Sequence, residues 1–294
     1  MRTLLLMTGA ALVIGAAPPK KPLTPNDVVA AAPASAWKAI PADELMVIDL
    51  KSGDRVVVQL APAFAPVHVA NIKALARANY WDGATIYRLQ DNYVAQWGLN
   101  DSDKPWPAGV VAKPPAEYVR PLKGLRIKPL GYPDAYAPGV GFADGWPVAY
   151  SAKAGWANLA HCYASVGVGR DLAPDTGTGG ELYAIIGQAP RQLDRNIALV
   201  GRVVDGIAML SALPRGPAPM GFYADKAQYV PIARIRLASE MPAAERPSYQ
   251  AMDTASATFA TYLHVKANRK DDFYVRPAGG VDLCNVNVPV RKQP

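Results

Sequence analysis

Residues 87–98 read Tyr-Arg-Leu-Gln-Asp-Asn-Tyr-Val-Ala-Gln-Trp-Gly. Two apolar pieces flank a Gln-Asp-Asn turn, and this pattern predicts two short strands joined by a tight loop. Arg88 and Gln96 stand among apolar and aromatic neighbours, although such side chains are rarely buried without partners. Two interpretations follow: both side chains point into solvent, or they project into a shallow apolar groove as one fixed cation and one amide.

Length and composition indicate a turn-rich globular protein. The chain has 294 residues, of which 50% are hydrophobic, with 28 Pro and 24 Gly. This suits one large domain, or a medium domain with extensions, and argues against a helical bundle. The formal net charge of +7 is spread along the chain, with no run of Lys and Arg interleaved with aromatic residues. We therefore expect no nucleic-acid partner.

Residues 1–17 have the pattern of a secretory signal peptide. Arg2 precedes an apolar stretch that ends in small residues, and cleavage is expected near Ala16 or Ala17. The stretch is shorter than the ~20 apolar residues that a membrane span needs. We find no longer apolar run downstream, so we expect no stable membrane span after cleavage. The prediction is an exported, soluble, periplasmic protein.

Export makes a disulfide possible, and the chain has only two cysteines, Cys162 and Cys284. A disulfide between them and a pair of buried free thiols are both compatible with the sequence. A zinc site is not expected, because His161-Cys162 has no second pair of ligands nearby at metal-binding spacing.

The first half of the chain predicts a linker, a hairpin and a helix. Residues 18–36 are rich in Pro, Ala and Lys and are expected to be a linker. Residues 45–50 and 55–60 predict a β-hairpin, with Val56, Val58 and Leu60 on one face. Residues 65–77 predict a helix that buries Val69, Ile72, Leu75 and Ala76, with His68 on its polar side.

The second half alternates loops and strands. Residues 101–150 are expected to be a long loop insertion, and strand character returns over 159–166. The glycine-rich segment 167–180 is interpreted as a turn, because it lacks the phosphate-binding GxxxxGK[ST] pattern and leads into a strand. Further predicted elements are strands over 181–187, 197–204 and 229–237 and a short helix over 207–213. Beyond Pro242 we expect a helix over 254–268 and short extended segments at 273–275 and 281–286.

This order of elements, together with several motifs, resembles a cyclophilin. Residues 87–98 resemble the family's Phe-His-Arg-Val-Ile-x-x-Phe-Met-x-Gln-Gly-Gly, with the family's spacing from Arg88 to Tyr93 and Gln96. Ala65-Pro66 with Val69-Ala70-Asn71 and Leu75 resembles the signature of the first helix. Weaker similarities are Gly180–Ala184 to Ser-Gln-Phe-Phe-Ile, Leu193-Asp194 to Leu-Asp-Gly, and Gly201–Val203 to Phe-Gly-Arg-Val. The resemblance covers residues 45 to 237.

The resemblance implies a peptidyl-prolyl cis/trans isomerase. Its fold would be mainly β: a closed eight-stranded antiparallel β-barrel capped by two helices. The implied domain spans 37–240 with the insertion at 101–150, and residues 241–294 form a C-terminal extension that packs on the barrel. The family needs no cofactor or metal. The expected partners are proline-containing polypeptides, with folding of exported proteins as the task and a monomer as the assembly.

The resemblance also assigns site residues. The implied catalytic residues are Arg88, which would donate to the imide nitrogen as resonance is lost, and Gln96, which would hold the guanidinium or a substrate carbonyl. The implied substrate-binding residues are Tyr93, Val94, Glu181, Tyr183 and Leu193.

The sequence departs from the family at several site positions, which leaves alternatives open. Glu181 replaces the family's Gln, Tyr replaces both pocket Phe residues, Ile197 replaces a His and Gln192 a Trp. The carboxylate either competes with substrate for Arg88 or aligns it, and the added hydroxyls would make the groove more polar. The alternative function is a catalytically weak cyclophilin-like chaperone or proline-peptide-binding module. A small-ligand barrel of lipocalin type would need an apolar lumen instead of a surface groove.

Overall fold

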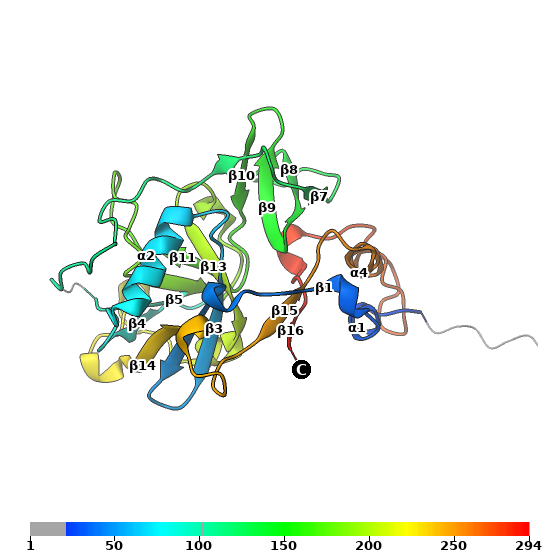
Figure 1. Ribbon diagram of the computed structural model, residues 1–294. Coiled ribbons are helices and arrows are strands. Elements are labelled where there is room, and N and C mark those ends of the chain that lie inside the picture. The colour runs from blue at the N-terminus through cyan, green and yellow to red at the C-terminus, as the bar shows by residue number, and fades with distance from the viewer. Residues whose placement is uncertain (1–21, 101–102, 294) are drawn as a thin grey trace, which may run out of the picture.

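The computed structural model describes residues 22–100 and 103–293, and it contains a closed barrel beside two smaller sheets (Figure 1). The eight barrel strands follow the order β11-β12-β5-β4-β14-β2-β3-β13, and all neighbours are antiparallel. Their bounds are β2 Leu45–Leu50, β3 Arg55–Leu60, β4 Thr85–Leu89, β5 Val94–Gly98, β11 Ser165–Val168, β12 Leu182–Ile185, β13 Leu199–Asp205 and β14 Val230–Leu237. The predicted mainly-β, eight-stranded barrel is confirmed.

The hairpin β2–β3 has the predicted alternation and is buried on both faces. Val56, Val58 and Leu60 point into the barrel core. Val47 and Val57, on the opposite face, pack against the C-terminal extension. Burial on both faces explains the nearly continuous apolar runs of these two strands, since neither face meets water.

Two helices cover the barrel. In α2 (Pro66–Arg77) the four predicted core residues are all buried, and they belong to the same cluster as the barrel interior: Val69, Ile72, Leu75 and Ala76. The short α3 (Ile207–Ala212) adds Leu210 to that cluster. The period of 3.6 residues in 65–77 therefore predicted the correct face.

The prediction for His68 was wrong, because its partner comes from the insertion. Ala65 precedes α2 and has no side chain that can cap the helix. Glu117 takes that place: its carboxylate accepts the backbone N–H groups of Val67 and His68, each at 2.9 Å. The His68 ring is fully buried, with Nδ1 2.6 Å from Glu117 Oε2 and Nε2 3.2 Å from the Thr176 carbonyl oxygen. This pair joins the insertion to the barrel.

The insertion 101–150 contributes strands to a sheet, where we expected a long loop. The five strands of this sheet, four from the insertion and β10 from just beyond it, follow the order β6-β10-β9-β8-β7 and project beside the barrel (Figure 1). Their bounds are β6 Arg120–Pro121, β7 Ile127–Pro129, β8 Gly139–Ala143, β9 Trp146–Ser151 and β10 Trp156–Leu159. The strand expected over 159–166 is also corrected, since β10 ends at Leu159 and β11 begins at Ser165.

The chain ends build the third sheet together. Strands β1 (Trp37–Ala39), β15 (Tyr249–Met252) and β16 (Val290–Lys292) pair in the order β1-β15-β16, and helices α1 (Pro25–Ala30) and α4 (Ala257–Ala267) lie against each other. The expected linker 18–36 thus contains α1, which buries Val28. The predicted helix near 254–268 is present as α4, but 273–275 and 281–286 form no strands.

The extension packs on both the barrel and the five-stranded sheet. Tyr249 and Ala251 lie in one cluster with barrel residues, and Phe259 of α4 meets Phe142 of β8 edge-on, with ring centroids 5.1 Å apart. Residues 1–17, the predicted signal peptide, lie outside the described residues. In the part of the chain that is described, no helix has the length and apolar character for crossing a membrane.

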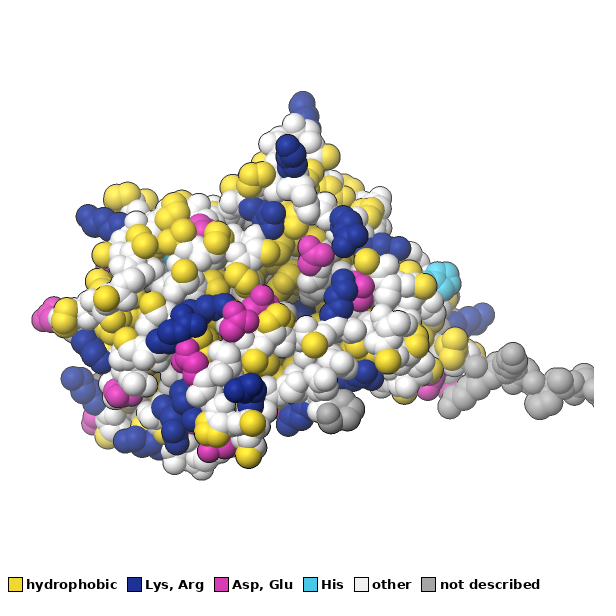
Figure 2. Space-filling view, in the orientation of Figure 1, with side chains coloured by type: hydrophobic (Ala, Val, Ile, Leu, Met, Phe, Trp, Pro, Cys, Tyr) yellow, Lys and Arg dark blue, Asp and Glu magenta, His cyan; other side chains and the backbone are white. Residues whose placement is uncertain are grey.

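A disulfide joins Cys162 to Cys284, which resolves the alternative between a cystine and two free thiols. The two residues are 122 positions apart, so the bond links the barrel side of the molecule to the C-terminal extension. In the chain-entropy model a loop of this length stabilises the fold by about 4–5 kcal/mol. Figure 2 shows the Lys and Arg side chains of one face spread among acidic and apolar ones, without a single basic patch.

Candidate active site

A groove of about 650 Å³ lies on the outer face of four adjacent barrel strands, β11, β12, β5 and β4. The strand registers place one residue from each strand in a row: Gly167 pairs with Tyr183, Tyr183 with Gln96, and Gln96 with Arg88. The last three of these side chains line the groove. The structure therefore supports the second interpretation of residues 87–98, a groove into which one cation and one amide project.

A β-bulge at Tyr87 brings two consecutive side chains into the groove. The register of β4 and β5 pairs Ile86 with Trp97 and Arg88 with Gln96, so Tyr87 is the extra residue. In a regular strand Tyr87 would point to the face opposite Arg88. The bulge removes this alternation, and both side chains line the groove while Ile86 stays in the core.

The Arg88 guanidinium is held by three neutral acceptors. Its Nε donates to the backbone carbonyl oxygen of Met220 (2.7 Å), Nη1 donates to Gln96 Oε1 (2.9 Å), and Nη2 donates to Gln90 Oε1 (2.6 Å). A guanidinium has five N–H groups, so in the described part of the chain two remain for a ligand. The side chain is thus fixed in orientation without being neutralised.

Among the described residues, hydrogen bonds connect Glu181 to Arg88 through two intervening side chains, those of Tyr87 and Gln96. Gln96 Nε2 donates to the Tyr87 hydroxyl (2.6 Å), which in turn donates to Glu181 Oε2 (2.6 Å). Glu181 Oε1 also accepts two backbone N–H groups beyond β5, those of Leu99 (2.9 Å) and Asn100 (3.0 Å). The carboxylate therefore orients Tyr87 and, through it, Gln96. In the described part of the chain, Glu181 and Arg88 form no direct ion pair.

The pKa shifts in the groove reflect burial. Burial lowers the pKa of Arg88 from its ordinary value, while the nearby Tyr93 and Tyr87 oppose that shift. An arginine remains charged under these conditions. Burial, and then the charge of Glu181, raise the pKa of Tyr87 far above its usual value. Tyr87 therefore stays a neutral hydroxyl that relays hydrogen bonds between Gln96 and Glu181.

An apolar pocket lies beside Arg88. It is formed by one small cluster on the outer face of the barrel: Tyr93, Val94, Tyr183, Ile185 and Ile197. The Arg88 guanidinium carbon lies 5.8 Å from the Tyr93 ring centroid and 5.2 Å from that of Phe222. The Tyr183 hydroxyl lies 3.2 Å from buried His161 Nε2, so it points away from the groove. The added hydroxyl at Tyr183 therefore does not make this pocket more polar, contrary to our expectation.

The other end of the groove has an aromatic wall. The Trp106 ring stacks on Tyr80 with centroids 5.1 Å apart, and Lys104 Nζ lies 5.0 Å from the Tyr80 centroid. Asp171 and Asp175 from the turn-rich loop also line the groove. The groove thus combines the Arg88 cation and an apolar pocket with an aromatic wall and carboxylates.

Most of the sequence-predicted site residues meet here, with one exception. Arg88, Gln96, Tyr93, Val94, Glu181 and Tyr183 all line the groove. Leu193 does not line it, because it belongs to a 3-10 turn whose Arg191 is drawn toward Asp134 of the insertion. Sequence reasoning missed Gln90 and Phe222. Gln90 lies two residues after Arg88, and the strand period of two could have placed both on one side.

The sequence model described as cyclophilin type peptidyl-prolyl cis-trans isomerase/CLD matches residues 45–237. No curated protein matches the chain.

Solved structures similar to the chain include the cyclophilin AquaCyp293 from Hirschia baltica, with 21% sequence identity and a TM-score of 0.68. That similarity covers 92% of this chain and 97% of the other, so the shared fold extends beyond residues 45–237. A Cryptosporidium parvum cyclophilin type peptidyl-prolyl cis-trans isomerase, in the presence of the dipeptide Ala-Pro, has 13% identity and a TM-score of 0.40, covering 66% of this chain and 98% of that one.

Proposed function

The chain belongs to the cyclophilin family of peptidyl-prolyl cis-trans isomerases, and we propose that Arg88 is its catalytic residue, acting on X–Pro bonds of polypeptides bound in the groove. Gln96 orients Arg88, and the cluster around Tyr93 and Tyr183 holds the proline ring. The observation that carries the proposal is a guanidinium fixed by three neutral acceptors next to an apolar pocket.

The reaction needs a donor and no nucleophile. Resonance of the amide bond sets a barrier of ~18–20 kcal/mol to rotation, and the resonance is lost in the twisted transition state. The imide nitrogen then regains a lone pair, and an N–H donor placed beside it stabilises that state more than the planar ground state. Arg88 supplies such a donor at any physiological pH, because an arginine side chain stays protonated.

Glu181 and Tyr87 support this role by orienting Gln96. Glu181 accepts a hydrogen bond from the Tyr87 hydroxyl, whose oxygen accepts one from Gln96 Nε2. This arrangement leaves Gln96 Oε1 facing Arg88, from which it accepts a hydrogen bond. We therefore assign Glu181 to alignment, and not to competition with the substrate.

The test is isomerisation of a proline-containing tetrapeptide by the native chain and by Arg88→Ala. We expect the native chain to accelerate isomerisation and Arg88→Ala to lower kcat/KM by about 10²–10³-fold, the usual effect of removing a transition-state donor. Arg234→Ala is the matched control, because Arg234 is exposed on β14 and does not line the groove. If the native chain binds the peptide but does not accelerate its isomerisation, the alternative function, a proline-peptide-binding module or chaperone, replaces this one.

We also propose that the protein assists folding of exported proteins in the periplasm. The signal-like residues 1–17 and a disulfide in the folded chain support this, because disulfides persist in oxidising compartments. In a Gram-negative host, the full chain should be recovered from the periplasm with Cys162 and Cys284 oxidised, and a chain without residues 2–17 should remain in the cytoplasm. Recovery of the full chain from the cytoplasm with residues 1–17 attached would contradict the proposal.

A further inference from the structure

A buried polar chain begins at the wall of the proline pocket and leads away from the groove. Tyr183 is 6% exposed, and its hydroxyl lies 3.2 Å from His161 Nε2. His161 Nδ1 lies 2.9 Å from Asp194 Oδ1. Because a carboxylate only accepts, Nδ1 carries a proton, and in the neutral ring Nε2 accepts the proton of the Tyr183 hydroxyl. This hydroxyl therefore has a fixed partner outside the pocket.

The residues around Tyr183 restrict its ring to one position. A Cβ atom added at Gly167, on the neighbouring strand, would lie 2.3 Å from the Tyr183 hydroxyl oxygen, so the hydroxyl passes directly over Gly167. The ring itself packs with Val94 and Ile185 in the pocket cluster. A buried hydroxyl without a partner is costly, so loss of the His161 contact would drive the ring to seek water through the pocket.

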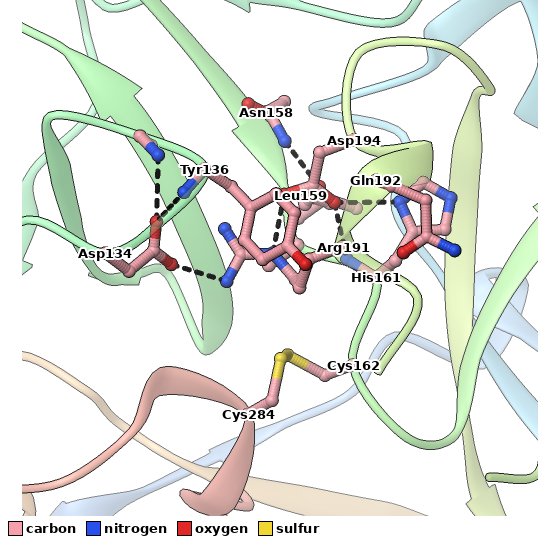
Figure 3. Close-up of polar contacts among 12 residues, drawn as sticks. Asp134, Tyr136, Asn158, Leu159, His161, Cys162, Arg191, Gln192, Asp194 and Cys284 are labelled. Atoms are coloured by element: carbon pink, nitrogen blue, oxygen red, sulfur yellow. Dashed lines mark hydrogen bonds and ion pairs between the residues drawn. A yellow bond between two sulfur atoms is a disulfide. The ribbon is translucent and has the colours of Figure 1, made fainter. Parts of the chain in front are cut away.

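His161 is in turn held by residues of the barrel and of the insertion. Asp194 Oδ1 also accepts the backbone N–H of His161 (2.9 Å), and its Oδ2 accepts Arg191 Nε (2.6 Å). Arg191 Nη1 donates to Asp134 Oδ2 (2.6 Å), which lies between β7 and β8 of the five-stranded sheet. Figure 3 shows these side chains in sequence from Asp134 to His161, with the disulfide of Cys162 beside them.

Buried ion pairs hold the side chains of this polar chain in place. Arg191 and Asp194 each have 5% of their side chain exposed, and Arg191 also covers the Tyr136 ring at 5.1 Å. Burial alone would raise the pKa of Asp194, but the hydrogen bond from His161 and the charge of Arg191 outweigh it and lower that pKa. The carboxylate is therefore ionised at neutral pH, and it fixes both His161 and Arg191.

We propose that His161 is a positioning residue of the isomerase site, which sets the width of the proline pocket by holding the Tyr183 hydroxyl. Asp194, Arg191 and Asp134 fix His161, so the pocket depends on the five-stranded sheet although no residue of that sheet lines it among those described. The inference rests on the proposed function, since the pocket is taken to bind proline.

A double-mutant cycle tests the contact between His161 and Tyr183. His161→Leu should raise KM for a proline-containing tetrapeptide by about tenfold with little change in kcat, because it leaves the Tyr183 hydroxyl unpartnered. In the Tyr183→Phe background the same change should alter KM by about twofold or less, because no hydroxyl remains to be displaced. An equal rise in KM in both backgrounds would overturn the proposal, since His161 would then act on the site only through general stability.

A second pair of variants tests the link between His161 and the insertion. This test remains possible even if the His161→Leu variant does not fold. Asp134→Asn weakens the outer end of the chain, where the carboxylate is 17% exposed, and should raise KM about two- to threefold. The matched control is Arg202→Gln. Arg202 also ties the barrel to the five-stranded sheet, through the Gly145 carbonyl oxygen and the Trp146 ring, but has no bond toward Tyr183. The control should leave KM unchanged; equal effects of the two variants would overturn the proposal.

The same cycles can be measured as Kd by titration of the tetrapeptide, and this separates the two proposals. If the native chain binds the peptide without isomerising it, the proposed catalysis fails, but the coupling between His161 and Tyr183 is still measured in Kd. If the native chain isomerises the peptide and the cycle is additive, only the positioning role fails.

Discussion

Arg88 and Arg191 are the centres of two polar networks that differ in the partners of their guanidinium groups. Arg88 donates to two side-chain amides and one backbone carbonyl, all neutral. Arg191 lies between two carboxylates, Asp194 and Asp134, and is almost completely buried. Arg88 also has two N–H groups left for a ligand in the described part of the chain, and it borders a groove.

In our proposal, this difference separates a catalytic cation from a structural one. Two carboxylates neutralise Arg191, and its charge is used within the fold. Neutral oxygens orient Arg88 but leave its charge available to a developing lone pair in the groove. The same side chain therefore serves stability in one network and, in our proposal, catalysis in the other.

Removal of Arg191 should have the largest effect on stability. Arg191→Ala leaves Asp194 and Asp134 without their cation, and breaking a buried pair in this way costs about 3–5 kcal/mol of the free energy of unfolding. Urea unfolding measures this cost. The control is Arg215→Ala, whose ion pair with Asp91 is exposed to solvent and should contribute much less to stability. A cost no larger than that of the control would show that Arg191 is not structurally important.

A carboxylate placed beside Arg88 should make the Arg88 network resemble the Arg191 network. Gln90→Glu puts a negative charge next to Nη2 and should lower kcat/KM by about tenfold, because part of the Arg88 charge is neutralised. Gln90→Met removes the acceptor without adding charge and should lower kcat/KM by about two- to threefold. If Gln90→Glu is as active as the native chain, neutral partners are not what makes Arg88 suitable for catalysis.

The smallest effect is the pH dependence of the structural network. The pKa of Asp194 is lower in the folded chain than its ordinary value of about 3.9. Its contribution to stability is therefore fully present above that ordinary value and is lost as pH falls through the folded pKa. The difference in free energy of unfolding between the native chain and Asp194→Asn should shrink below about pH 4. A difference that stays constant down to pH 2 would contradict the assignment.

The Arg88 network was largely predictable from the sequence, because its main members are close together in the chain. Arg88 and Gln96 lie on two consecutive strands with a short turn, so their pairing depends on local spacing. The alternation in β3 and the apolar face of α2 are local as well. The bulge at Tyr87 and the contact of Arg88 with the Met220 carbonyl oxygen were not predictable, because they depend on register and on a loop 132 residues away.

The structural network was missed because its members are distant in the sequence and ordinary in type. Asp134 meets Arg191 across 57 residues, and His68 is buried only because Glu117, 49 residues away, reaches it. The segment that forms most of the five-stranded sheet was interpreted as a loop because its strands are short and interrupted by Pro and Gly. In addition, β6 pairs with β10, which follows it in the sequence only after the other three strands of the sheet. Such contacts leave no periodic pattern.

The most direct test of the account is to measure kcat/KM and the free energy of unfolding together for Arg88→Ala. We predict that kcat/KM falls by about 10²–10³-fold while the free energy of unfolding changes by about 1 kcal/mol or less, because Arg88 is half-buried and bonds only neutral acceptors. Isomerase activity equal to that of the native chain, or a loss of activity matched by a loss of stability as large as that of Arg191→Ala, would contradict it.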